Sequence, residues 1–296
     1  MSALRVLVAI LNYNAVEDCV ATALSLKAME YPAFDLIVVD NASTNDAADR
    51  VSRACPWLVV ERNPENRGYT GGVNSILARA ISRGYDYVLQ TNNDIAVAPD
   101  ALTRLVATAR AHPDAAVVCG VEIGWTSGAV RSTGGRRHTL IRSRTLWSTR
   151  LPPGPMPVAF PQGALYLVDV GAARAGLALD ENLFMYYEEA DLGFRLRAMG
   201  RRAYVDPGVP VRHKADARQY VPRGGYLQQR NRLYLVRRHG APWQLAAHVG
   251  YVLIIELPLK VILRVAQGRP RFALACATGF LDGLRNRMGV GAAARW

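Results

Sequence analysis

Apolar runs and amphipathic stretches alternate over the first 121 residues of the chain. Five apolar runs have the composition of strands buried on both faces: 4–11, 36–39, 57–61, 85–90 and 115–121. Four segments between them have helical spacing: 16–29, 45–54, 71–83 and 99–111. The alternation predicts an α/β fold with a Rossmann-like, mostly parallel central sheet flanked by helices. Ligands of such sheets bind at the carboxyl ends of the strands.

Residues 122–162 break this rhythm, because they are rich in glycine and proline. We expect irregular backbone here, a long loop or a mobile flap. Regular structure is predicted to return with a strand over 164–170, a helix over 188–199 and short strands near 203–205 and 209–211. A basic amphipathic helix follows over 225–239.

The segment from Trp243 is different, because residues 245–263 are strongly apolar. Polar residues recur there at multiples of four, at Gln244, His248, Glu256, Lys260 and Arg264. This spacing gives an apolar helix one polar stripe, which favours a helix lying in the plane of a membrane surface. Packing against the protein or a second copy is the alternative, and the charges disfavour a membrane span. We therefore expect a catalytic domain over 1–240 and an apolar, basic helical segment over 241–296.

The chain has 296 residues, a net charge of +12 and a pI of about 9.9. This balance favours a polyanionic partner, and we expect an anionic membrane surface and phosphate-bearing substrates rather than nucleic acid, because no nucleic-acid-reading motif is present. Four widely spaced cysteines without a CxxC pair argue against a disulfide scaffold and a zinc finger. The N-terminal run lacks a cleavage site, so we expect a core strand and a cytoplasmic protein, peripheral on the inner face of the membrane.

Carboxylates and amides stand where two predicted strands end. Asp40 ends the second run, and Asn92, Asn93 and Asp94 follow the fourth. Asp40 could accept hydrogen bonds from a ribose or a base, or cap a turn with Ser43. The Asn-Asn-Asp cluster offers hard oxygen ligands suited to Mg²⁺ or Mn²⁺, or it caps a turn before the next helix.

Three further motifs could carry chemistry. A glycine-rich turn over 66–74 enters a helix and either approaches an anion or is a plain helix start. Glu188, Glu189 and Asp191 either cap a helix or, by mutual repulsion, raise the pKa of one carboxyl toward that of a general base. His213 follows a short strand and is either structural or a metal ligand alongside Asp94.

Seven motifs stand in one order along the chain: LNYN, VVDNASTND, NRGYTGGVN, NNDI, QGALYLV, FMYYEEADLGFRLRAMG and VRH. With them the chain resembles the family 2 inverting glycosyltransferases of GT-A fold, and within these the rhamnosyltransferase-like enzymes of surface polysaccharide assembly. The resemblance runs from about Val6 to His239. It implies transfer of a sugar from a nucleotide-diphosphate donor to a hydroxyl group, by a metal-assisted single displacement that inverts the anomeric carbon.

The resemblance also implies roles for individual residues. The implied metal ligands are Asp94 and His213, with Mn²⁺ or Mg²⁺ as the ion. The catalytic base falls on Glu189, where the family usually has Asp, and Glu188 and Asp191 are alternatives. The implied nucleotide-sugar-binding residues are Asn12, Tyr13, Asn14, Asp40, Asn66, Arg67, Gly68, Asn74, Asn92, Asn93, Gly163 and Ala164.

The implied partners are a dTDP-rhamnose or UDP-sugar donor and a glycan or lipid-linked acceptor. The apolar C-terminal helices could also pair two copies into a homodimer. An alternative function comes from two departures from the family pattern, at Asn92 and Glu189. It is a non-catalytic GT-A module that binds a nucleotide sugar or a partner enzyme.

Overall fold

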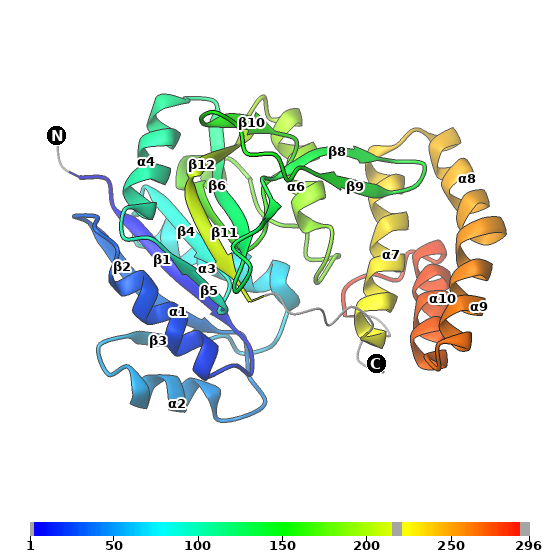
Figure 1. The fold of residues 1–296 in the computed structure, drawn as a ribbon, viewed down its shortest axis with the longest axis horizontal. Helices are drawn as coiled ribbons and strands as arrows, with labels where there is room; N and C mark the ends of the chain where they lie inside the picture. Colours follow the sequence, from blue (N-terminus) through cyan, green and yellow to red (C-terminus); the bar gives the residue numbers. More distant parts are fainter. Residues whose placement is uncertain (1–2, 215–220, 291–296) are drawn as a thin grey trace.

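A mixed ten-stranded sheet forms the centre of the computed structural model, which describes residues 3–214 and 221–290 (Figure 1). Its main path runs through β10 (Met156–Val158), β12 (Arg202–His213), β6 (Ala115–Gly124), β11 (Leu165–Asp169), β4 (Tyr87–Thr91), β1 (Val6–Asn12), β2 (Phe34–Asp40) and β3 (Val59–Arg62). Two short strands join its sides, β5 (Ile95–Val97) on β12 and β7 (Val130–Ser132) on β6.

The first four strands of this α/β fold, β1 to β4, pair in parallel, as predicted, and β12 is parallel to β6. Strand β11 runs antiparallel between β4 and β6. Because β2 and β4 lie on opposite sides of β1, the order of strand addition reverses at β1. The carboxyl ends of these strands share an edge, since Asn12 pairs in register with Asp40 and Ile10 with Thr91. Such a switch point is where open α/β sheets bind ligands.

Helices cover both faces of the sheet. One face carries α1 (Glu17–Lys27), α2 (Ala47–Ala54) and α4 (Ala101–Ala111), and the other α3 (Gly68–Ser82), α5 (Val170–Arg174) and α6 (Glu188–Ala198). Helix α1 shows the reason: Cys19, Ala23 and Leu26 recur at helical spacing and are fully buried against the sheet. All four cysteines are free and buried.

The expectation of irregular backbone over 122–162 is wrong in part. Strand β6 continues to Gly124, β7 and β10 extend the sheet, and β8 (Gly135–Thr139) pairs with β9 (Arg144–Trp147) as a separate hairpin. A Cβ at Gly135 would collide with the ring of Phe160. Glycine here therefore permits close packing of a strand and does not mark a loop. The two short strands expected near 203–211 are one strand, β12, with an irregularity after Val205.

The C-terminal helices form a unit beside the sheet, at the right of Figure 1. Helix α10 (Pro270–Leu284) packs along α7 (Pro222–His239). Helices α8 (Pro242–Tyr251), η1 (Val252–Glu256) and α9 (Leu257–Ala266) follow one another without a break. The π-helical turn η1 adjoins Pro258, which has no N–H to continue the α-helical ladder. Within the described ranges, no helix has the length and apolarity that crossing a bilayer requires.

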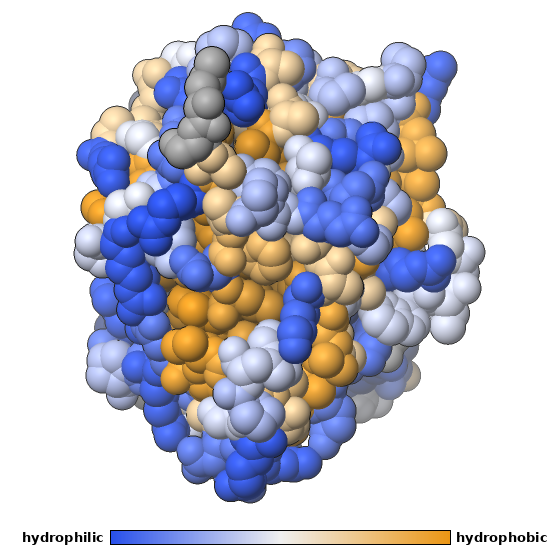
Figure 2. Space-filling view, turned by 90° about the vertical axis from the view of Figure 1, so that its left-hand side faces the viewer, coloured by the Kyte–Doolittle hydropathy of each residue, from blue (hydrophilic) through white to orange (hydrophobic). Residues whose placement is uncertain are grey.

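The opposite side of the molecule, at the left of Figure 1, carries the N-terminal strands and helices, among them the edge strand β3. Figure 2 shows this side, where a hydrophobic area is interrupted by hydrophilic residues. Its large exposed apolar side chains include Leu24, Trp57 and Val59. The ammonium group of Lys27 lies 4.2 Å from the centre of the Trp57 ring, so charged groups interrupt this apolar surface. Charged neighbours of this kind keep a sheet edge from pairing with another chain.

Candidate active site

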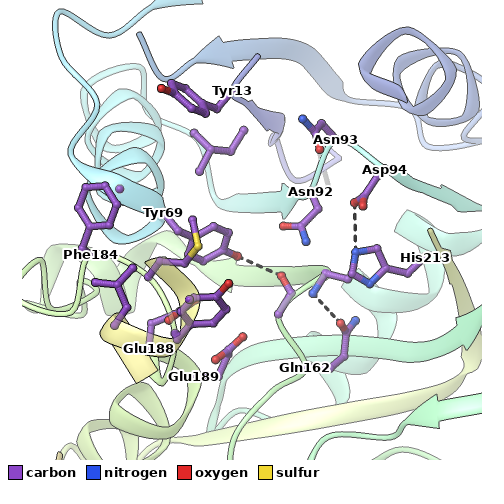
Figure 3. A pocket seen from close by; sticks show the side chains of 18 of the residues that line it. Tyr13, Tyr69, Asn92, Asn93, Asp94, Gln162, Phe184, Glu188, Glu189 and His213 are labelled. Carbon is purple, nitrogen blue, oxygen red and sulfur yellow. Dashed lines mark hydrogen bonds and ion pairs between the residues drawn. The ribbon is translucent and has the colours of Figure 1, made fainter. Parts of the chain in front are cut away.

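A cavity of about 810 Å³ opens at the switch point of the sheet (Figure 3). Its volume lies in the range of small-molecule sites, about 300–1,000 Å³. Most of the predicted site residues line it: Asn12, Tyr13, Asn66, Gly68, Asn92, Asn93, Asp94, Gly163, Ala164, Glu188, Glu189 and His213. Residues that the sequence analysis did not select line it too, among them Asn41, Tyr69, Glu122, Arg131, Trp147, Gln162, Phe184, Tyr186, Arg223 and Leu227.

Two predicted site residues instead shape the turns behind the cavity. The fully buried carboxylate of Asp40 accepts hydrogen bonds from the Ser43 backbone N–H, at 3.0 Å, and from the Ser43 hydroxyl. The structure therefore has the capping turn that was one of the two interpretations of Asp40. Asn14 accepts a hydrogen bond from the Thr44 backbone N–H at 2.8 Å, which ties the turns after β1 and β2 together.

Two more predicted residues, Arg67 and Asn74, also lie outside the cavity lining. Both contact Glu181, and Asn74 exchanges hydrogen bonds of 2.8 and 2.9 Å with the backbone of Leu179. These contacts fasten α3 to the segment that leads into the turn 183–187.

Asp94, His213 and Glu122 meet at one wall of the cavity. His213 Nε2 lies 3.1 Å from Asp94 Oδ1, and His213 Nδ1 lies 2.9 Å from Glu122 Oε1. Burial lowers the pKa of His213, but hydrogen bonds to both carboxylates outweigh it and raise that pKa to about 9. Asp94 offers a carboxylate oxygen, the ligand type that suits Mn²⁺ and Mg²⁺, and His213 places a ring nitrogen beside it. No cluster of three or more His, Cys, Asp or Glu placed to hold a metal occurs within 3–214 and 221–290.

The carboxylate pair Glu188 and Glu189 lines another wall of the same cavity, at the start of α6. Burial raises the pKa of Glu189 to about 7. Burial and the neighbouring Glu189 raise the pKa of Glu188 well above its usual value. A Cβ at Gly163 would collide with Glu189 Oε1, so glycine lets the backbone before β11 approach this carboxylate. The Tyr69 hydroxyl donates to the Gly163 carbonyl at 3.0 Å (Figure 3).

A strained turn leads into this pair. Phe184, Tyr186 and Tyr187 have φ values of +63°, +73° and +72°, which are unusual for residues with a side chain. Each such residue costs of the order of 1–3 kcal/mol and persists only where its surroundings hold it. The side-chain amide of Asn231 on α7 lies 2.9, 2.8 and 3.0 Å from the carbonyls of Leu183, Met185 and Tyr186. Helix α7 therefore holds the turn that positions Glu188 and Glu189.

Asp191 does not line the cavity. Its buried carboxylate lies 2.7 Å from His239 Nε2 and 2.8 Å from Arg195 Nε, with Arg238 Nε at 3.5 Å. Burial alone would raise its pKa, but His239 and the two arginines outweigh burial and lower it. Asp191 thus joins α6 to the end of α7.

We expect Asn231→Ala to lower kcat about 100-fold, because the released turn moves the carboxylate pair. Thr108→Val is the matched control, since it removes a buried 2.7 Å hydrogen bond from Thr108 on α4 to Asp206 on β12, and neither residue lines the cavity. Each change should cost roughly 1–3 kcal/mol of unfolding free energy, because each leaves buried polar atoms unpaired. Steady-state kinetics beside thermal denaturation separate the two effects. Equal losses of kcat in both variants would show that Asn231 contributes to stability only and does not position the carboxylate pair.

The model of the glycosyl transferase family 2 matches residues 7–170, which is more than half of the chain. The chain belongs to glycosyl transferase family 2. By this membership it is a glycosyltransferase.

Two curated relatives, from two strains of Mycobacterium tuberculosis (CDC 1551 / Oshkosh and ATCC 25618 / H37Rv), are N-acetylglucosaminyl-diphospho-decaprenol L-rhamnosyltransferases. The glycosyltransferase is 28% identical to each over 237 residues, which cover 71% of this chain and 76% of the relative.

Solved structures share the fold of the glycosyltransferase. One is the mannosyltransferase PcManGT from Pyrobaculum calidifontis in complex with GDP-Man and Mn²⁺, with a TM-score of 0.59, 17% identity and coverage of 97% of this chain and 88% of that one. Another is S. aureus TarS 1–349 in complex with UDP-GlcNAc, with a TM-score of 0.56, 15% identity and coverage of 96% and 92%. At this identity the likeness shows the fold alone, and the GT-A fold predicted from the sequence is confirmed.

Proposed function

We propose that the glycosyltransferase moves a sugar, rhamnose in the first place, from a nucleotide-diphosphate donor to a hydroxyl of a polysaccharide or lipid-linked glycan, with inversion. The observation that carries the proposal is that one cavity has a candidate general base on one wall and candidate metal ligands on another. Glu189, with its raised pKa, lines one wall, and the Asp94–His213 pair lines another.

In this mechanism Glu189 accepts the proton of the acceptor hydroxyl. The oxygen attacks the anomeric carbon from the side opposite the donor diphosphate, and the bond from that carbon to the phosphate oxygen breaks. Its electron pair leaves with the diphosphate, so one displacement inverts the carbon. Burial and the neighbouring Glu189 raise the pKa of Glu188 well above its usual value, so of the two carboxyls Glu189 is the one that ionises more readily and serves as the base.

A divalent cation, Mn²⁺ or Mg²⁺, fits the donor atoms of Asp94 and His213. Glu122 would orient His213 through Nδ1, and a bound metal would replace the Nε2 proton that now faces Asp94. Two protein ligands do not fill the coordination shell of such a cation, so phosphate oxygens of the donor and water would supply further ligands. A bound cation neutralises charge that develops on the leaving diphosphate.

The donor nucleotide would lie along Asn12, Tyr13, Asn41 and Asn66, which end or follow the strands β1, β2 and β3. Asn14, Asp40, Arg67 and Asn74 would support this wall from behind. The names of the curated relatives favour dTDP-rhamnose, while solved neighbours carry GDP-Man and UDP-GlcNAc, and a UDP-sugar is the second choice.

A lipid-linked acceptor is supported by the diphospho-decaprenol in the names of the curated relatives. Such an acceptor brings the enzyme to a membrane, which agrees with the anionic membrane surface expected from the sequence. The location on the inner face of that membrane and the homodimer stay predictions.

A transfer assay with a panel of donors tests this proposal. The purified enzyme, Mn²⁺ and a polyprenyl-diphosphate-linked N-acetylglucosamine are mixed with dTDP-rhamnose, UDP-N-acetylglucosamine or GDP-mannose. We expect the highest rate with dTDP-rhamnose and, by NMR of the product, an inverted anomeric configuration. Retention of configuration would contradict the mechanism, and transfer from another donor alone would replace the assigned sugar.

A further inference from the structure

The continuous helix formed by α8, η1 and α9 turns polar side chains toward the protein and apolar side chains toward the outside, the reverse of an ordinary surface helix. Its polar side chains face α7: Glu256 accepts from Arg232 at 2.5 and 2.7 Å and from Gln229 at 3.0 Å. Lys260 lies 2.9 Å from the same carboxylate, and the buried His248 lies 2.8 Å from a backbone carbonyl. Three members of the polar stripe seen in the sequence, His248, Glu256 and Lys260, therefore point toward the protein.

The apolar side chains of this helix point outward. Ile254 is 78% exposed and Ile262 is 66% exposed. Further exposed side chains on this helix and on the adjacent α10 are Leu253, Ile255, Leu259, Leu263, Val265, Leu274 and Leu281. A surface helix normally turns its apolar stripe to the core, and monomeric proteins rarely expose contiguous apolar surface of this kind. The inverted helix indicates that an apolar phase covers it.

Charge distinguishes between the partners that could cover this face. The segment 241–290 has two acidic residues, and both face inward: Glu256 against Arg232, and Asp282 against the Tyr226 hydroxyl at 2.9 Å. Exposed arginines stand at the two ends of α10 instead, with Arg269 just before it, Arg271 in its first turn and Arg285 just after it. A second copy would bring like charges together, whereas anionic headgroups match them.

We propose that this face docks on the surface of an anionic lipid bilayer, with α9 lying in the plane of the membrane and Arg269 and Arg271 at the headgroups. Burial of the isoleucines among acyl chains and attraction of the arginines would act together. Membrane docking deepens the proposed function, because docking serves the reaction only if the acceptor is lipid-linked as proposed. The evidence for the docking face itself, the contacts and exposures given above, does not depend on that acceptor.

Flotation of the full chain with vesicles tests the docking face. Vesicles of phosphatidylcholine alone are compared with vesicles that contain phosphatidylglycerol, using the wild type and three variants. We expect the wild type to float with anionic vesicles, and Ile254→Gln/Ile262→Gln and Arg269→Glu/Arg271→Glu each to lower partitioning about tenfold or more. Leu24→Gln, which changes an exposed leucine on α1 at the other end of the molecule, should float as the wild type does.

Three results would overturn the inference. One is equal flotation of the wild type and the isoleucine variant, and another is flotation that does not respond to phosphatidylglycerol. The third is a lipid-free dimer, measured by analytical ultracentrifugation, that the isoleucine changes dissociate. Transfer to a short-chain, water-soluble acceptor is measured in parallel with the same proteins. Normal transfer without flotation would contradict the docking proposal alone. Flotation without transfer would support the docking proposal and contradict the proposed reaction.

Discussion

Replacing Glu189 with Gln should lower kcat about 10³-fold, because the amide cannot accept the proton of the acceptor hydroxyl. The change is nearly isosteric, so donor binding and folding should persist. In the wild type, the pKa of Glu189 near 7 means that the ionised, active base increases as pH rises through 7. We therefore expect kcat to fall about tenfold per pH unit well below that pKa. Initial rates between pH 5 and 9 measure both effects.

The neighbouring carboxyl supplies the matched control. Burial and the neighbouring Glu189 raise the pKa of Glu188 well above its usual value, which favours its neutral form over the carboxylate. Glu188→Gln should therefore change kcat less than tenfold and keep the acidic limb of the pH profile. Equal losses in the two variants, or a Glu189→Gln enzyme with normal turnover, would exclude Glu189 as the base.

Replacing Asp94 with Ala should lower transfer by a similar factor, about 10³-fold. In the proposed mechanism the lost carboxylate is one of two protein ligands for the cation. That cation would stabilise the charge on the leaving diphosphate by several kcal/mol. Mn²⁺ titration by electron paramagnetic resonance, in the presence of the nucleoside diphosphate, should show binding weakened at least tenfold beside the loss of rate.

Asp18→Ala is the control for Asp94. Asp18 is a half-exposed acid that lies 2.5 Å from Lys214 Nζ, next to His213 but outside the cavity lining. Its removal should leave Mn²⁺ affinity and rate within about twofold, as for surface ion pairs in general. An Asp94→Ala enzyme that keeps its Mn²⁺ response would locate the metal elsewhere.

The sequence was sufficient to predict the position of the cavity. Asn12 and Asp94 follow strands whose carboxyl ends meet at one edge of a parallel sheet, so strand order alone brings them together. Glu122 could have been found by the same rule, because it follows the apolar run 115–121. Asp40 shows the limit of the rule: strand position cannot tell a ligand-binding carboxylate from one that caps its own turn.

Contacts between residues far apart in sequence account for what was missed. Asn231 reaches carbonyls 45 to 48 residues earlier in the chain, and the basic pattern of 225–239 gives no sign of it. The strands β7 to β10 were missed because each has only three to five residues, too few for a clear alternation of apolar and polar positions. Strand β10 also pairs with a distant partner, β12. The spacing of the polar stripe in 244–264 was readable, but its inward direction depends on Arg232 of another helix.

A crystal structure of the enzyme with Mn²⁺ and the nucleoside diphosphate of its donor tests the central claim most directly. Our account predicts anomalous density for Mn²⁺ on Asp94 and His213, with the diphosphate bound to it and Glu189 facing the side of the cavity left for the acceptor. A metal held by other residues, or a diphosphate bound against Glu189 itself, would contradict the account.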